Sequence, residues 1–202
     1  RLADVMTKGA GSVYASFFDV DWSYPAERIM GKLFLPFLLQ PYRRCIERGE
    51  ISLVHVGGFK IKYGSLELPV NVATQQHLEL NGSVEETLEK YTCNKPLLNS
   101  LVSRQYYRLG YWKTTLKHIN YRRFFDITDL VGLRMENQQA FEELHSLIFD
   151  LVASGYFSGL RVDHIDGLAE PQSYLQALQE RCPDSYLVVE KILTGNEQLP
   201  NS

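Results

Sequence analysis

The sequence predicts an α/β fold, and two strand-like segments separated by one helical segment carry this prediction. Residues 158–167 and 186–193 each contain a short apolar run, long enough for one buried strand, and the two runs end in Asp163 and Glu190. Parallel strands joined by a helical crossover can lie side by side, and α/β folds collect ligands at the carboxyl ends of their strands. We therefore expect both acids to project into one ligand-binding site, here called the mouth, at the carboxyl ends of the two strands.

The first part of the chain is expected to be a loop followed by short strands and helices. Residues 17–22 are predicted to be a short extended piece, and residues 32–39 a strand. A helix is predicted at residues 41–48, closed by Gly49, because glycine is favoured just after a helix end.

A β-hairpin is predicted next. Residues 51–56 and 59–63 flank Gly57 and Gly58, and paired glycines supply the positive φ that a tight turn needs. We interpret this hairpin as scaffold.

From Ser83 onward the pattern becomes helical. Ser83 followed by Glu86 matches a capping box, and residues 97–116 are periodic apart from Gly110. These features predict an inserted helical region.

The last part of the chain repeats helix and strand. Residues 137–154 place apolar side chains on one helical face, and Gly155 ends that helix. The helix between the two acids starts at Glu170 and Pro171, since proline is favoured at the first helical position. Its apolar stripe, which Pro183 ends, consists of Tyr174, Leu175, Leu178 and Cys182.

Composition and charge exclude several classes of protein. The 202 residues are 45% hydrophobic and 22% charged, as expected for a folded chain with a sizeable core. The formal net charge is -3 and the basic residues are scattered, whereas nucleic-acid binding needs a basic face. A neutral ligand fits better, and no nucleic-acid partner is expected.

Cysteine spacing and hydropathy indicate the cellular compartment in which the protein is expected. Cys45, Cys93 and Cys182 are far apart and lack CxxC spacing, so neither a disulfide framework nor a zinc site is indicated. The longest apolar stretch, residues 33–39, is interrupted by Pro36 and is too short to cross a bilayer. We expect a cytoplasmic protein with no membrane partner and no secretory signal.

Both ends of the chain suggest a segment of a longer enzyme. The sequence opens at Arg1, in a loop of small residues, and stops in the polar string of residues 194–202. We predict three parts: residues 1–76 with a loop, a strand and the hairpin; residues 77–136 as a helical insertion; and residues 137–202 as the helix-strand-helix-strand segment that carries the acids.

The two acids suggest glycoside hydrolysis. In that chemistry one carboxylate attacks the anomeric carbon and a second, protonated carboxyl protonates the leaving oxygen. Arg161 shares a strand face with Asp163 by the period of two, so it can hold Asp163 ionised.

A structural interpretation of the same residues remains open. Asp163, His164 and Asp166 can instead cap the next helix, and Glu190 can pair with Lys191. Acidic strand ends are common in α/β folds, so spacing alone does not decide between the two interpretations.

The residues themselves resemble a known superfamily. The segments are GLRVDHIDGL and YLVVEKIL. They resemble the second and third signature regions of the alpha-amylase superfamily of glycoside hydrolases. The resemblance implies that Asp163 is the nucleophile and Glu190 the acid/base, within part of a (β/α)₈ TIM barrel around its fourth and fifth strands.

Within the superfamily, ordered blocks are similar to the maltooligosyltrehalose synthase family. The blocks are FFDVDW, INYRRFFDITDLVGLRMEN, SGLRVDHIDGL, residues 186–193 and Gly195-Asn-Glu197. The family usually has Pro where Ile165 stands and often has Asp after the position of Tyr63. The superfamily's first and fourth regions are missing, so the resemblance implies an incomplete catalytic domain.

This resemblance implies an isomerase of trehalose biosynthesis. The enzyme would convert the reducing-end α-1,4 linkage of a maltooligosaccharide into an α,α-1,1 linkage by a retaining double displacement, without metal or organic cofactor. The 202-residue chain alone is expected to be inactive, and its unpaired barrel strands invite self-association.

Further residues are candidates for sugar contact. Arg122 and Arg123 can hydrogen-bond sugar hydroxyls, or they can form an ion-pair network with Asp126 and Asp129. His164 reaches the mouth only if the strand breaks after Asp163, and Asp166 only if it faces inward. Aromatic side chains that can stack on glucose, or fill the core instead, are Trp112, Tyr121, Phe124 and Phe125.

Other functions stay open. The same superfamily includes α-glucan hydrolases and glucanotransferases. A metal-dependent hydrolase can use Asp163, His164 and Asp166 as ligands, although a second histidine cluster is missing. A non-catalytic carbohydrate-binding fragment is the third alternative.

Overall fold

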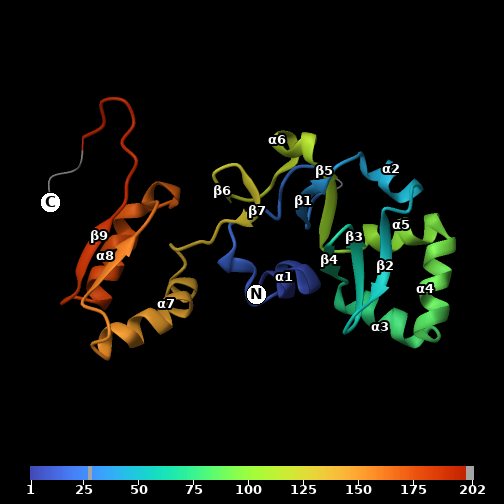
Figure 1. Ribbon diagram of the computed structural model, residues 1–202, viewed down its shortest axis with the longest axis horizontal. Coiled ribbons are helices and arrows are strands. Elements are labelled where there is room, and N and C mark those ends of the chain that lie inside the picture. The colour runs from blue at the N-terminus through green and yellow to red at the C-terminus, as the bar shows by residue number, and fades with distance from the viewer. Residues whose placement is uncertain (27–28, 199–202) are drawn as a thin grey trace. The chain divides into compact units, whose positions relative to one another are not determined.

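The computed structural model describes residues 1–26 and 29–198 and divides into two compact units (Figure 1). The first unit is Arg1–Gly132 and the second is Leu133–Ser202. Of the predicted polar string at residues 194–202, the last four residues lie outside the described part.

The first unit mixes short helices with short strands. Its helices are α1 (Leu2–Lys8), α2 (Tyr42–Glu47), α3 (Val72–Leu80), α4 (Val84–Cys93), α5 (Lys95–Ser103) and α6 (Thr115–His118). Its strands are β1 (Leu33–Leu38), β2 (Ile51–His55), β3 (Phe59–Tyr63), β4 (Leu66–Pro69), β5 (Tyr107–Tyr111), β6 (Arg123–Phe124) and β7 (Ile127–Val131). Short 3₁₀ turns lie at Gly9–Gly11, Ala15–Phe17 and Trp112–Thr114.

A parallel pair of strands, β1 and β5, forms the centre of this unit. Leu33 pairs with Tyr107 and Leu35 with Leu109, and all four side chains are buried. The register shifts between Leu35 and Leu38, around Pro36, which has no N–H to donate to the ladder. The predicted strand at residues 32–39 is thus confirmed.

Strand β5 corrects the helix predicted across residues 97–116. That helix ends at Ser103, and Tyr107–Tyr111 is a strand. A Cβ on Gly110 would lie 2.1 Å from the Phe34 ring, so glycine is needed where the two strands pack. Pairing with β1, far away in the sequence, overrides the local helical periodicity.

The predicted hairpin is confirmed and is part of a larger sheet than expected. β2 and β3 pair antiparallel, and the turn between them places Gly57 at φ 61° and Gly58 at φ 126°. A third strand, β4, pairs with β3 and makes a three-stranded sheet.

Helices α4 and α5 confirm the predicted helical region in part. Ser83 Oγ accepts a hydrogen bond from Glu86 N at 3.2 Å, and Glu86 Oε2 accepts one from Ser83 N at 3.0 Å. The expected capping box is therefore present. The boundary drawn at residues 76 and 77 falls inside α3, and the segment up to residue 136 also contains β5, β6 and β7.

Long-range hydrogen bonds join the segment around Asn120 to the start of β1. The buried Asn120 accepts from Phe34 N at 3.0 Å and donates to the carbonyls of Asp21 and Lys32. Val20 forms an isolated bridge with Tyr121, so the segment predicted to be extended at residues 17–22 meets the family-like block there, although Phe17 lies in a 3₁₀ turn.

The second unit is a β-α-β unit with one additional helix. Its elements are α7 (Gln138–Ala153), β8 (Gly159–Val162), a 3₁₀ turn (Ile165–Gly167), α8 (Pro171–Arg181) and β9 (Tyr186–Val189). β8 and β9 pair in parallel from Gly159 with Tyr186 to Val162 with Val189. The predicted crossover is confirmed, with Pro171 as the first residue of α8.

The core of this unit lies on one face of the strand pair. Leu160, Val162 and Leu187 pack against a cluster formed by Phe141 and Phe149 of α7 and by Leu178 and Cys182 at α8. The stripe predicted for α8 makes this contact, whereas the apolar face predicted for α7 is buried only in part: Leu147 and Ile148 are exposed and Phe149 is buried instead. No described helix is long and apolar enough to cross a membrane.

Candidate active site

Asp163 and Glu190 follow directly after the paired strands β8 and β9. Val162 lies opposite Val189, so the next residue of each strand is Asp163 or Glu190. Backbone pairing continues past the strand ends, because Glu190 N donates to Val162 O at 2.8 Å and Ile165 N to Glu190 O at 3.4 Å. The structure therefore brings the two predicted acids together at one end of the sheet.

The side chains of both acids belong to the face opposite the helices. Leu160, Val162 and Leu187 face the helical core, and side chains alternate along a strand. By this alternation the other face carries Arg161, Asp163, Val188 and Glu190. The expectation that both acids project to the same side agrees with this register.

Arg161 holds one oxygen of Asp163. Its Nε donates to Oδ1 at 2.6 Å, and both side chains are 66% exposed. An exposed ion pair adds little to stability, so its main effect is to orient the carboxylate. Asp163 Oδ2 makes no hydrogen bond within the described residues. The predicted proximity of Arg161 to Asp163 is thus confirmed.

Glu190 is positioned by the backbone of His164. Its Oε2 accepts a hydrogen bond from His164 N at 2.8 Å. His164 has φ 58° and ψ 50°, the left-handed conformation that non-glycine residues rarely adopt. The strand therefore ends before His164. The predicted access of the His164 side chain to the mouth requires this break.

Asp166 ties the turn after β8 to the segment after β9. Its Oδ1 accepts from Lys191 Nζ at 2.9 Å and its Oδ2 from Ile192 N at 3.0 Å. The Ile192 N–H, followed by Lys191, lowers the pKa of Asp166. Both oxygens are engaged within the loop, so the structure gives Asp166 a positioning role.

Lys191 and Glu197 complete this tie. Lys191 Nζ lies 2.7 Å from Glu197 Oε1, and the hydrogen bonds to Glu197 and Asp166 raise the pKa of Lys191. The Lys191 ammonium lowers the pKa of Glu197. This role of Lys191 and Glu197 was not predicted from the sequence, although the family-like block Gly195-Asn-Glu197 includes Glu197.

The two structural contacts suggested for these residues, pairing of Glu190 with Lys191 and side-chain capping of the following helix, are not the ones observed within the described residues. Lys191 pairs with Asp166 and Glu197, whereas Glu190 accepts from a backbone N–H. Helix α8 is capped at Glu170 without a side-chain hydrogen bond, so Asp163, His164 and Asp166 do not cap it. Within the described residues no group of three or more His, Cys, Asp or Glu side chains can hold a metal ion.

Comparison with known proteins identifies the relatives of this chain. No protein-family model matches it. Two curated proteins of Mycobacterium tuberculosis strains, each named putative maltooligosyl trehalose synthase, are 36% identical over 197 residues, or 97% of this chain and 22% of theirs. The chain is homologous to a segment of the maltooligosyl trehalose synthases.

Solved structures agree with this relationship. A glycosyltrehalose synthase matches with a TM-score of 0.78 and 34% identity, over 99% of this chain and 25% of that one. The maltooligosyltrehalose synthase from Arthrobacter ramosus matches with a TM-score of 0.74 and 32% identity, over 98% of this chain and 22% of that one. The chain thus spans about a quarter or less of each relative.

Residues 119–132, which belong to the longest of the family-like blocks, lie in the first unit. Arg122 Nε donates to Asp19 Oδ2 at 2.8 Å, and Arg123 donates to Asp126 Oδ1 at 2.6 Å. These contacts favour the ion-pair interpretation, and the partnership of Arg122 with Asp19 was not among the pairings that the sequence suggested. Sugar contact by either arginine stays a prediction.

Tyr121 belongs to the core of its unit. It is 7% exposed and its hydroxyl donates to Thr128 O at 2.5 Å. Burial raises the pKa of Tyr121 to about 12. The core interpretation of Tyr121 is therefore favoured over stacking on a sugar.

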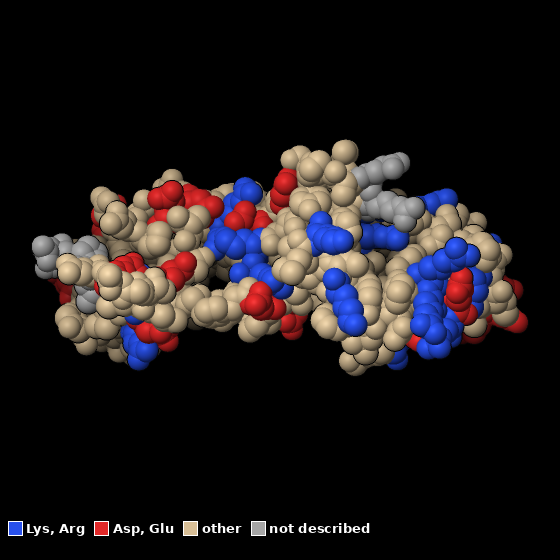
Figure 2. Space-filling model, turned by 90° about the horizontal axis from the view of Figure 1, so that it is seen from above, with Lys and Arg blue, Asp and Glu red and all other residues tan. Residues whose placement is uncertain are grey.

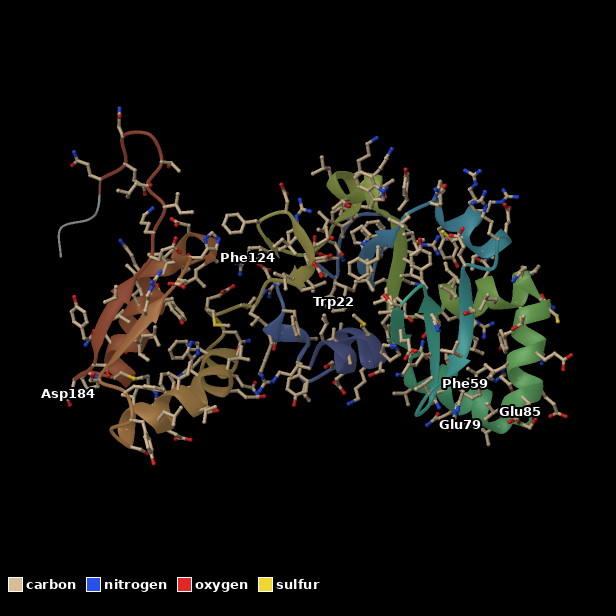
Figure 3. The ribbon with its side chains drawn as sticks, in the orientation of Figure 1. Trp22, Phe59, Glu79, Glu85, Phe124 and Asp184 are labelled. Carbon is tan, nitrogen blue, oxygen red and sulfur yellow. The ribbon has the colours of Figure 1, made fainter. Side chains whose placement is uncertain are left out.

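Three other aromatic candidates present exposed rings. Phe124, labelled in Figure 3, is 41% exposed, Phe125 is 57% and Trp112 is 51%. Phe124 and Phe125 contact each other edge to face, with ring centroids 4.6 Å apart. Stacking on glucose stays a prediction for these rings.

Proposed function

We propose that a full-length enzyme carrying this chain rearranges the reducing-end α-1,4 linkage of a maltooligosaccharide into an α,α-1,1 linkage. The proposal rests on one observation above all: Asp163 and Glu190 follow paired parallel strands at the same register. Homology to maltooligosyl trehalose synthases supports the choice of reaction.

The first half of the reaction uses both acids. Asp163 attacks the anomeric carbon while Glu190 protonates the departing oxygen, so the glycosidic bond breaks and a glycosyl-enzyme ester forms. Arg161 orients the attacking carboxylate and the His164 N–H holds that of Glu190. Glu190 ends this step deprotonated.

The second half reverses the roles. Glu190 takes the proton from the anomeric hydroxyl of the released glucose, whose oxygen attacks the anomeric carbon of the glycosyl-enzyme; the bond from that carbon to Asp163 breaks and frees the carboxylate. The product contains the same atoms as the substrate, so the reaction is an isomerisation. This double displacement needs carboxyl groups roughly 5 to 5.5 Å apart, and we expect that separation.

Retention of glucose distinguishes this activity from that of related enzymes. If water reaches the glycosyl-enzyme first, the same two acids catalyse hydrolysis, and if another glucan reaches it they catalyse glucan transfer. Product analysis separates the three outcomes, because only isomerisation removes reducing ends without releasing a shorter chain.

The test is the substitution Asp163→Asn in the full-length enzyme. It removes the attacking charge and keeps the shape, so we expect kcat to fall about a thousandfold or more while maltooligosaccharide still binds. Asp184→Asn is the matched control, because the exposed Asp184 lies in the turn before β9 (Figure 3). A D163N enzyme that keeps a tenth of wild-type turnover would refute the assignment.

A further inference from the structure

A cavity in the first unit carries an excess of positive charge. It lies between α2, α5 and β5, and its volume is ≈ 610 Å³, within the range of roughly 300 to 1,000 Å³ found for small-molecule sites. Four cations line it, Lys32, Arg43, Lys95 and Arg108, together with one acid, Glu47. Figure 2 shows Lys and Arg side chains gathered around α2.

Three of these cations are not neutralised by the protein that surrounds them. Arg43 Nε pairs with Glu47 at 2.9 Å. Within the described residues Lys32, Lys95 and Arg108 form no ion pair, although the whole chain has a net charge of -3. Burial and the nearby charge of Arg108 lower the pKa of Lys32. A bound anion would relieve this repulsion.

The polar groups of the cavity are mainly donors. The Arg108 guanidinium lies over the Tyr42 ring, 4.2 Å from its centroid. The Tyr42 hydroxyl donates to Asn99 Oδ1 at 3.0 Å, which leaves the Asn99 amide NH₂ for a ligand. Lys32 Nζ donates to the Ser103 carbonyl. With these acceptors engaged, the cavity suits a ligand that brings acceptor oxygens.

We propose that this cavity binds a small phosphate monoester, with the phosphate held by Lys32, Lys95 and Arg108. A phosphate offers several acceptor oxygens and up to two negative charges, and arginine and lysine are its usual partners. Three unpaired cations suit a dianion better than a single carboxylate. The site goes beyond the proposed function, because a maltooligosaccharide carries no charge.

Calorimetric titration of the purified protein tests the proposal. The probes are inorganic phosphate and glucose 6-phosphate, with glucose and sodium chloride of matched ionic strength as controls. We expect saturable binding of both phosphates and of neither control. Tighter binding of glucose 6-phosphate than of inorganic phosphate assigns the ester as ligand. Equal affinity for the two, or binding of inorganic phosphate alone, refutes the proposal that the ligand is an ester. The absence of saturable binding overturns the site.

A matched pair of variants locates the binding. Lys95→Gln should weaken phosphate binding about tenfold, whereas Lys90→Gln, an exposed lysine outside the cavity lining, should not. Lys95 is the first residue of α5, where the helix dipole disfavours a cation, so its removal should not unfold the helix. Arg108→Gln is the second variant. If both cavity variants bind phosphate like wild type at unchanged Tm, the proposal is wrong.

Discussion

At the scale of single residues, the backbone of His164 decides how Glu190 is held. A non-glycine residue in the left-handed region costs about 1 kcal/mol, and such strain often lies at functional sites. Here it directs the His164 N–H to Glu190 Oε2. The contact belongs to the main chain, so the imidazole can be removed without losing it.

Substitution His164→Gly separates these two roles. Glycine adopts φ near 58° readily, so the N–H contact to Glu190 and the fold should be kept. If the imidazole contacts sugar as predicted, KM for maltooligosaccharide should rise about tenfold in the full-length enzyme, with Tm unchanged or higher. An unchanged KM would remove His164 from the substrate-binding residues.

The loop tie at Asp166 predicts a dependence on pH. Its pKa is lowered in the folded state, chiefly by the Ile192 N–H and then by Lys191. The tie therefore stabilises the fold above the ordinary pKa of an aspartate, about 3.9, and is lost as pH falls through the lower folded pKa.

Substitution Asp166→Asn should remove that part of the dependence. Thermal unfolding of wild type and D166N, compared from pH 7 to about pH 3, should show the two Tm values converging as pH falls. Because Asp166 is exposed, the difference at pH 7 should be small. A Tm difference between wild type and D166N that grows toward low pH would contradict the stabilising role of the ionised Asp166.

At the scale of elements, close packing between β1 and β5 depends on Gly110. A Cβ there would overlap the Phe34 ring, at 2.1 Å from Cζ and 2.3 Å from Cε2. Phe34 is buried and lies on the strand that pairs with β5, so it has little room to move.

Substitution Gly110→Ala should therefore destabilise the first unit by about 1 to 3 kcal/mol. Gly11→Ala is the control, since nothing lies within 4 Å of a Cβ there and Gly11 is not at positive φ. Urea denaturation of the two variants measures the difference. Equal midpoints would show that the strands do not pack as closely as described.

At the scale of the whole molecule, this chain corresponds to 22% of the curated relatives it matches. The proposed reaction needs a site that encloses the sugar, and strand β9 has exposed Tyr186, Val188 and Val189 side chains. We predict that residues 1–202 alone form no trehalose-ended product.

The purified 202-residue chain tests this directly. Assays with maltooligosaccharide should show no loss of reducing ends, and sedimentation should show self-association through exposed strand edges. Formation of the α,α-1,1 product by this chain alone would show that the acids need no further part of the enzyme. A monomer at high concentration would contradict the predicted self-association.

The sequence by itself determined the elements whose signals are local. The hairpin around Gly57 and Gly58, the capping box at Ser83 and the β-α-β unit with its two acids were all predicted. Each depends on residues near one another in the chain, where periodicity, turn chemistry and capping act directly. The short contact between Arg161 and Asp163 follows from the same strand period.

Tertiary structure decided the features that join distant segments. Tyr107–Tyr111 is a strand because it pairs with β1, and Arg122 pairs with Asp19 because Val20 bridges Tyr121. Glu190 is held by His164, and Asp166 by Lys191 and Ile192, across the parallel ladder. No sequence period encodes these pairings, since the energy of each contact exists only after the strands have met.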